Sequence, residues 1–88
     1  MSSRERHEAV WEGLPRGVAP ADFALRRDFL LAHVDAGAHV LDVGCGEGAF
    51  ASALLGAGAS VVAVDVAEEP LRRARAREPS LDLRLIEE

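Results

Sequence analysis

Residues 40–48 read VLDVGCGEG, and the fold that we expect for the chain follows from these residues. Its first four residues form a short, mostly apolar run with the length of a buried β-strand, and glycines follow at positions 44, 46 and 48. Glycine accepts positive φ angles and has no side chain, so such a loop turns sharply and lets a ligand approach its backbone. Residues 49–55 are rich in alanine and leucine, which favour a helix. The stretch therefore predicts a strand, a glycine loop and a helix in direct succession.

The same alternation continues toward the C-terminus. Residues 60–65 read SVVAVD, a continuous apolar run typical of a strand that is covered on both faces. Residues 67–77 predict a helix that stops before Pro79, and leucines alternate with polar residues over 81–85 as in a third strand. Strands that alternate with helices indicate an α/β fold whose parallel sheet is built by right-handed crossovers.

Two helices are expected before the first strand. Residues 3–12 are mostly charged and predict a short helix, and residues 13–17 form a loop because they contain two glycines and a proline. A second helix should begin near Pro20 and end at Gly37. Trp11 is expected to be a packing residue, with a role as a lid over a ligand as the alternative.

The helix over 67–77 carries four arginines that we expect on its solvated face. Glu68 precedes Arg72 by four residues and Glu69 precedes Arg73 by four, an order that favours ion pairs along a helix. The alternative is an anion-binding patch, but interleaved acidic residues make a solvated face the preferred interpretation.

The length and composition exclude several classes of protein. Eighty-eight residues make at most one small domain. The net charge of −5, with ten arginines and fifteen acidic residues, argues against binding to nucleic acid phosphates. No run approaches the ~18 apolar residues of a membrane span, and the polar N-terminus does not read as a secretory signal, so we expect a cytoplasmic chain. The one cysteine cannot form an internal disulfide, and the three histidines lack metal-ligand spacing, so no metal site is expected.

The chemistry of the chain is expected around the glycine loop. Asp65 ends the second strand about 20 residues after the loop begins, where a carboxylate can accept hydrogen bonds from a ribose diol. The spacing of Gly44, Gly46 and Ala49 also fits a dinucleotide fingerprint. Against a nicotinamide cofactor stands Asp42, whose charge would face a pyrophosphate unfavourably and suits an ammonium group better. A nicotinamide-dependent oxidoreductase therefore stays as the less favoured alternative.

These residues closely resemble the class I S-adenosylmethionine-dependent methyltransferases. The resemblance covers residues 38–88 and rests on the glycine loop together with residues 61–65, which read VVAVD. It implies a Rossmann-like, three-layer α/β/α fold with a parallel sheet, here truncated to about three strands. It also implies two parts: an N-terminal helical preamble, 1–37, and the first half of the cofactor-binding domain, 38–88.

The resemblance implies a role for each matching residue. Asp42 would orient the loop and the methionine end of S-adenosylmethionine, Asp65 would bind the ribose hydroxyls, and Val66 would pack on the adenine. The backbone of the loop would lie along the cofactor. The expected cofactor-binding residues are thus Asp42, Gly44, Cys45, Gly46, Gly48, Asp65 and Val66. Ala67 departs from the family pattern, which often has a helix-capping residue there.

The function that the resemblance implies is methyl transfer to an unidentified acceptor, with a small molecule favoured. No residue is assigned a catalytic role, because Cys45 has no nearby His or Cys and its place in the loop explains it. The family's sheet has seven strands, so the first strand here should have an uncovered apolar edge that a partner chain could cover. We accordingly expect the 88-residue chain alone to be inactive and poorly stable. A non-catalytic cofactor-binding or interaction module is the alternative function.

Overall fold

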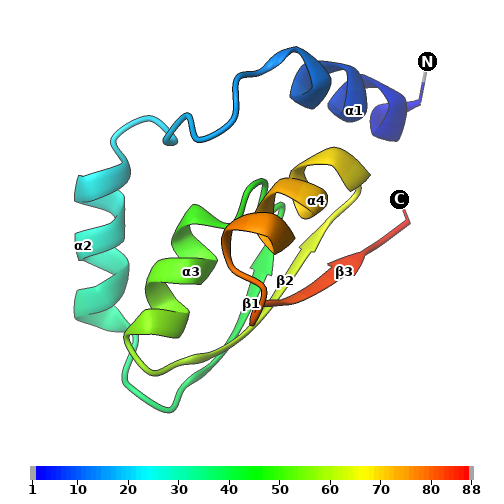
Figure 1. Cartoon of the computed structure of the whole chain (residues 1–88). Helices are drawn as coiled ribbons and strands as arrows, with labels where there is room; N and C mark the ends of the chain where they lie inside the picture. The colour runs from blue at the N-terminus through cyan, green and yellow to red at the C-terminus, as the bar shows by residue number, and fades with distance from the viewer. Residues whose placement is uncertain (1, 88) are drawn as a thin grey trace.

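A computed structural model describes residues 2–87 (Figure 1). Helices α1 (Ser3–Gly13) and α2 (Phe23–His33) precede the alternating part of the chain. This part consists of β1 (His39–Val43), α3 (Ala49–Gly56), β2 (Ser60–Asp65), α4 (Glu68–Arg77) and β3 (Asp82–Leu85). The strands form one parallel sheet in the order β1-β2-β3, which confirms the predicted α/β fold.

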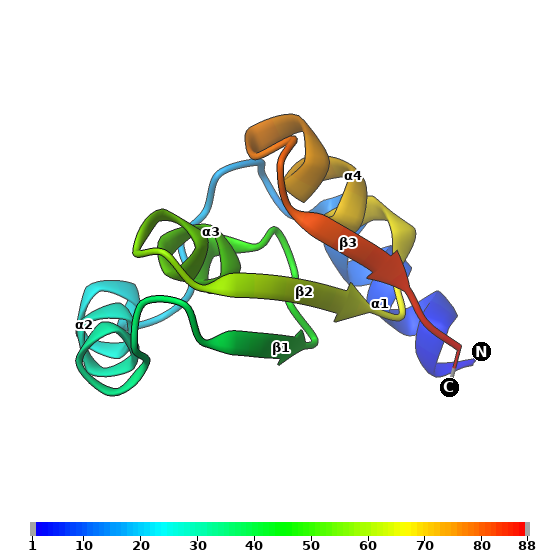
Figure 2. The same cartoon turned by 90° about the horizontal axis from the view of Figure 1, so that it is seen from below.

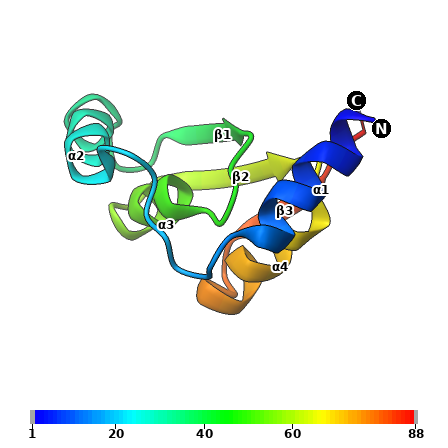
Figure 3. The same cartoon turned by 90° about the horizontal axis from the view of Figure 1, so that it is seen from above.

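Helices α3 and α4 lie on the same face of the sheet (Figures 1 and 3). Two right-handed crossovers that step in the same direction across a sheet place their helices on one side. Alternate residues of the strands point to this side, and the core there contains Val40, Val61, Ala63 and Leu83 together with Leu54 of α3. This packing fixes the carboxyl ends of β1 and β2 next to each other, with the glycine loop above them.

The first strand lies at the edge of the sheet described here (Figure 2). Leu41 and Val43 alternate with the core residues of β1 and are 64% and 68% exposed. Next to this strand, an apolar cavity of about 670 Å³ lies between α2, β1 and α3, with Leu25 and Phe29 of α2 in its lining. The edge of the sheet that the sequence marked as apolar thus exposes large apolar side chains.

The second helix is shorter than the sequence predicted. Residues 20–22 form a turn instead, in which the Phe23 N–H donates to the Pro20 carbonyl at 3.2 Å and Asp22 has a φ of 53°. Aspartate tolerates this left-handed conformation better than most residues. The helix ends at His33 because Val34 is already extended. No helix within residues 2–87 is both long and apolar enough to cross a membrane.

The arginines of α4 do not all face solvent. Arg73 is 8% exposed, so the prediction of a solvated arginine face is wrong at this position. It forms the expected ion pair with Glu69 at 3.2 Å, but Glu69 also pairs with Arg72 at 3.0 Å. Glu68 lies 3.8 Å from Arg4 of α1 in place of the predicted partner Arg72. The packing of α1 on α4 caused these differences, since it buried one arginine and offered a new partner to Glu68.

Candidate functional site

The glycine loop, residues 44–48, connects β1 to α3 through three residues with positive φ. The φ angles are 73° at Gly44, 55° at Gly46 and 79° at Gly48. The backbone N–H groups of Gly44 and Cys45 both donate to the carbonyl of Val64, at 2.9 and 3.0 Å, which anchors the loop on β2. Other residues would adopt these conformations only at a cost of about 1–2 kcal/mol each.

Asp65 links the loop to the end of the second strand. Its Oδ2 accepts a hydrogen bond from the Gly46 N–H at 2.9 Å, and its Oδ1 accepts one from the Ala67 N–H at 3.1 Å. The residue is 7% exposed. A carboxylate has about four acceptor positions, so each oxygen keeps room for a further donor. Asp65 can therefore stabilise the loop and still receive the hydroxyls of a ligand.

Two other groups of the site are affected by the charge of Asp65. Partial burial raises the pKa of Asp42 on β1, and the carboxylate of Asp65 raises it further. Burial also raises the pKa of the Cys45 thiol to about 12, with Asp65 and Asp42 as additional causes. The thiol is thus neutral at physiological pH and is not an activated nucleophile. The two carboxylates together favour a positively charged group of a ligand.

Two cavities border the glycine loop. One has a volume of about 410 Å³ and is lined by Gly44, Gly46, Asp65 and Val66 together with residues of α1. The other, of about 420 Å³, is lined by Asp42 and by loop residues 44–47, with the segment 14–20 on its far side. The structure therefore places six of the seven predicted residues on these cavities, and Gly44 and Gly46 on both.

Gly48 is the seventh predicted residue and lines neither cavity. A Cβ at this position would lie 3.2 Å from the Leu81 side chain and 3.4 Å from Ala74. Its absence lets the loop pack closely against α4 and the segment before β3. The geometry of Gly48 thus supports a packing role.

The N-terminal helix contributes three residues to the site, and the sequence indicated a ligand contact only for Trp11, as the alternative to packing. Ser3, His7 and Trp11 follow one another at intervals of four, so they lie on one face of α1, and all three line the cavity at Asp65. The Nδ1 of His7 lies 2.6 Å from the Ser3 carbonyl, within the same helix. The spacing of four was visible in the sequence, but nothing there indicated what this face would contact.

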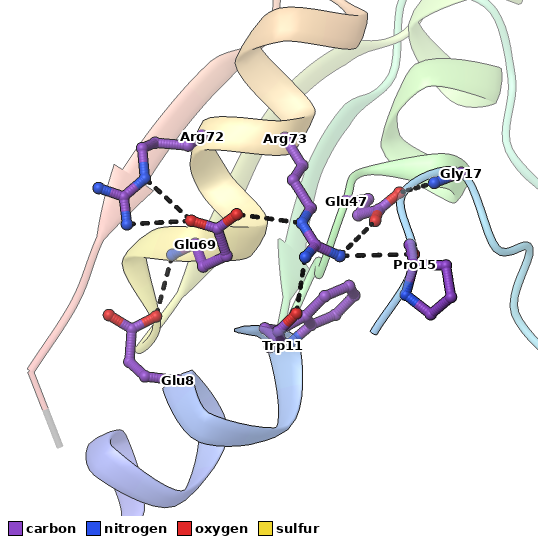
Figure 4. A network of polar contacts seen from close by, with 8 residues as sticks. All are labelled: Glu8, Trp11, Pro15, Gly17, Glu47, Glu69, Arg72 and Arg73. Atoms are coloured by element: carbon purple, nitrogen blue, oxygen red, sulfur yellow. Dashed lines mark hydrogen bonds and ion pairs between the residues drawn. The ribbon is translucent and has the colours of Figure 1, made fainter. Parts of the chain in front are cut away.

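Arg73 connects α4 to the glycine loop and to the N-terminal segment (Figure 4). Its Nη1 donates to Glu47 of the loop at 3.2 Å, and its Nη2 donates to the carbonyl of Trp11 at 2.7 Å. The other carboxylate oxygen of Glu47 accepts from the Gly17 N–H at 3.2 Å. Both charged side chains are buried, at 7% and 8% exposure, and each has several partners. Such a pair tolerates burial only when its remaining hydrogen bonds are made, as they are here.

A further contact also joins α1 to α4. Ala67 cannot cap α4 with its side chain, but the Oε1 of Glu8 accepts a hydrogen bond from the Glu69 N–H at 2.9 Å. This N–H lies in the first turn of α4, where a capping side chain normally accepts. The carboxylate of α1 thus replaces the missing local cap.

Within residues 2–87, His, Cys, Asp and Glu side chains form no group of three or more that could hold a metal ion. The residues at the carboxyl ends of the parallel strands form a ligand site, with a glycine loop after the first strand and a carboxylate after the second.

Comparison with known families agrees with this geometry. Residues 40–87 match the methyltransferase-domain family, and the chain belongs to this family. The match begins at the strand before the glycine loop and ends after β3, so it contains Asp42, the loop and Asp65.

Several curated relatives are ubiquinone biosynthesis O-methyltransferases. The protein from Xanthomonas oryzae is 46% identical over 52 residues, which are 58% of this chain and 22% of that protein. The protein from Thiobacillus denitrificans is 52% identical over 40 residues, 46% of this chain and 17% of the relative. The protein from Vibrio vulnificus is 45% identical over 53 residues, which are 58% of this chain and 23% of that protein. The aligned segment thus covers less than a quarter of each relative.

A solved structure shares the fold over nearly the whole chain. It is a Pyrococcus horikoshii protein provisionally assigned as an RNA methyltransferase, with a TM-score of 0.63 and 20% identity. The likeness covers 98% of this chain and 51% of that chain. It shows that α1 and α2, outside the family match, also belong to a known arrangement.

Proposed function

We propose that this chain forms the cofactor-binding part of an S-adenosylmethionine-dependent methyltransferase. The observation that carries the proposal is the carboxylate of Asp65, held at the end of β2 by the Gly46 N–H and lining a cavity of about 410 Å³. Membership of the methyltransferase-domain family supports it.

The residues at the two cavities fit the chemistry of this cofactor. Asp65 offers acceptor positions for a ribose diol, and Val66 lines the same cavity with an apolar side chain. Asp42 lines the second cavity and offers a negative charge to an ammonium group. Because Gly44 and Gly46 border both cavities, a ligand with a diol at one end and an ammonium group at the other would run along the loop backbone.

The contribution of these residues to methyl transfer is binding and orientation. S-adenosylmethionine, when bound, supplies a sulfonium-activated methyl group. The loop and the two carboxylates would hold this donor in one position, and a fixed donor lowers the barrier to attack by a nearby acceptor. Cys45 serves neither as base nor as nucleophile, since its thiol stays protonated.

We favour a small molecule as the methyl acceptor. The names of the relatives support an oxygen atom of a small molecule as the methylated group. The net charge of −5 opposes binding to RNA phosphates. The RNA assignment of the structural neighbour does not weigh against this, because a likeness at 20% identity concerns the fold alone.

Calorimetry on the 88-residue chain tests the proposal. We expect binding of S-adenosylmethionine and of its demethylated product, S-adenosylhomocysteine, with no comparable binding of NAD. Tighter binding of NAD would refute the assignment. Because the 88-residue chain alone is expected to be inactive, turnover is tested on a longer chain that carries the further strands of the family's sheet. Binding of S-adenosylmethionine by that longer chain without turnover of any small-molecule acceptor would favour the non-catalytic module, the alternative function.

A further inference from the structure

Trp11 of α1 lines both cavities at the glycine loop. Its ring lies so close to Gly46 that a Cβ placed there would be 2.8 Å from the indole. A ligand that fills either cavity therefore lies against a wall to which this ring belongs. Trp11 is also the only tryptophan of the chain, so its fluorescence reports on this place alone.

The backbone of Trp11 is held by a buried arginine of α4. The Nη2 of Arg73 donates to the Trp11 carbonyl at 2.7 Å, while its Nη1 donates to Glu47 of the loop at 3.2 Å (Figure 4). The same Nη1 reaches the Pro15 carbonyl at 3.5 Å. One guanidinium thus ties the end of α1 to the loop that carries the ligand site. The hydrogen bond to the carbonyl does not depend on which side chain is at position 11, although the guanidinium also lies over the Trp11 ring, with its Cζ 5.8 Å from the ring centroid.

We propose that Trp11 is a ligand-contact residue of this site and that Arg73 is the positioning residue that holds it against the glycine loop. The inference rests on the proposed function for the identity of the ligand. It adds to that function a wall that comes from outside the matched domain, and a residue of α4 that acts on the ligand through Trp11.

The first test removes the indole ring and keeps the hydrogen bond of Arg73 to the backbone carbonyl at position 11. Trp11→Ala should weaken binding of S-adenosylhomocysteine by about tenfold, within the range for loss of an aromatic wall next to a nucleobase. Val10→Ala is the matched control, because Val10 lies on the same helix, is 61% exposed and lines neither cavity. Unchanged or tighter binding by Trp11→Ala, as expected for a ring that merely obstructs the site, would overturn the proposal.

The second test removes the hydrogen bond of Arg73 to the Trp11 carbonyl and keeps the indole ring. Removing Arg73 alone would leave Glu47 buried and unpaired and could unfold the chain. The double variant Arg73→Met with Glu47→Gln removes both charges and avoids this. We expect a red-shifted emission of Trp11, stronger acrylamide quenching and affinity reduced about as much as in Trp11→Ala. Arg75→Met, on the exposed side of α4, should change none of these.

A mutant cycle that combines Trp11→Ala with the Arg73→Met, Glu47→Gln variant separates a positioning role of Arg73 from a general effect on stability. If Arg73 acts through Trp11, adding Trp11→Ala to the double variant causes no further loss of affinity. Losses that multiply, or quenching that stays at the parental level, would overturn the positioning role. A parent chain that binds no S-adenosylhomocysteine would refute the proposed function and the ligand contact, while quenching would still decide whether Arg73 positions Trp11.

Discussion

Replacement of Asp65 should lower both the free energy of unfolding and the affinity for the ligand. The loss of stability should depend on how many of its two hydrogen bonds are removed. Its oxygens accept the Gly46 and Ala67 N–H groups at 2.9 and 3.1 Å in a residue that is 7% exposed. Hydrogen bonds to a charged group contribute about 1.5–3 kcal/mol each. Asp65→Asn keeps one acceptor and should lower the free energy of unfolding by about 1.5–3 kcal/mol, and Asp65→Ala by about 3–6 kcal/mol.

These losses are large for a domain of this size. At about 0.05–0.15 kcal/mol per residue, the chain has a total stability of roughly 4–13 kcal/mol, so Asp65→Ala could unfold it and Asp65→Asn is the informative variant. Urea titration followed by circular dichroism gives the free energy of unfolding, and calorimetry with S-adenosylhomocysteine gives the affinity. Each kcal/mol corresponds to a drop in Tm of about 4–8 °C.

Glu68→Ala is the matched control for Asp65. Its side chain is 52% exposed and lies 3.8 Å from Arg4, an arrangement whose contribution is about 0–1 kcal/mol. Glu68→Ala should therefore leave stability and affinity nearly unchanged. Equal losses in the Asp65→Asn and Glu68→Ala variants would show that Asp65 neither anchors the loop nor contacts the ligand.

Four further predictions concern the loop and the sheet edge. Gly46→Ala should lower the free energy of unfolding more than Gly44→Ala in urea titrations, because both need positive φ but only a Cβ at Gly46 meets the indole, at 2.8 Å. Cys45 should react with iodoacetamide far more slowly in the folded chain than in urea, and faster as pH rises toward its pKa of about 12, as followed by mass spectrometry. The pKa of Asp42 is raised, so its ionisation destabilises the fold; Asp42→Asn should raise the free energy of unfolding at pH 7, with a gain that shrinks as the pH falls toward the usual value of 3.8. Leu41→Lys, on the 64% exposed side chain at the sheet edge, should reduce self-association in sedimentation, and a monomeric parent chain with a Tm well above 50 °C would contradict an uncovered edge.

The strands, the loop and the helices between them could be predicted from the sequence because local chemistry specifies them. Apolar runs of four to six residues, glycines at alternate positions and alanine-rich segments each act on their own neighbourhood, and the structure has β1, α3, β2, α4 and β3 within a residue or two of the expected bounds. Both ends of α2 differ from the predicted bounds, because Asp22 before the helix and Val34 after it adopt conformations set by the turns around them.

The parts of the candidate site that are close in sequence could also be predicted. Asp65 follows its strand directly, and parallel pairing places the end of β2 beside the end of β1, so its contact with the loop follows from the topology. Gly48 shows the limit of this reasoning, since its sequence context matches that of the other loop glycines while its neighbours are Leu81 and Ala74.

The contacts of the N-terminal helix depend on tertiary packing alone. The contacts of Arg73 with Trp11 and Pro15, and of Glu8 with the first turn of α4, join residues roughly 60 positions apart. By sequence, Arg73 was one of four similar arginines on a charged helix, and Glu8 was one acidic residue among several. A buried charge is stabilised only by the partners that packing brings to it, and no local pattern encodes those partners. The sequence thus determined the glycine loop and its carboxylate, whereas the packing of α1 on α4 determined which residues close the site around them.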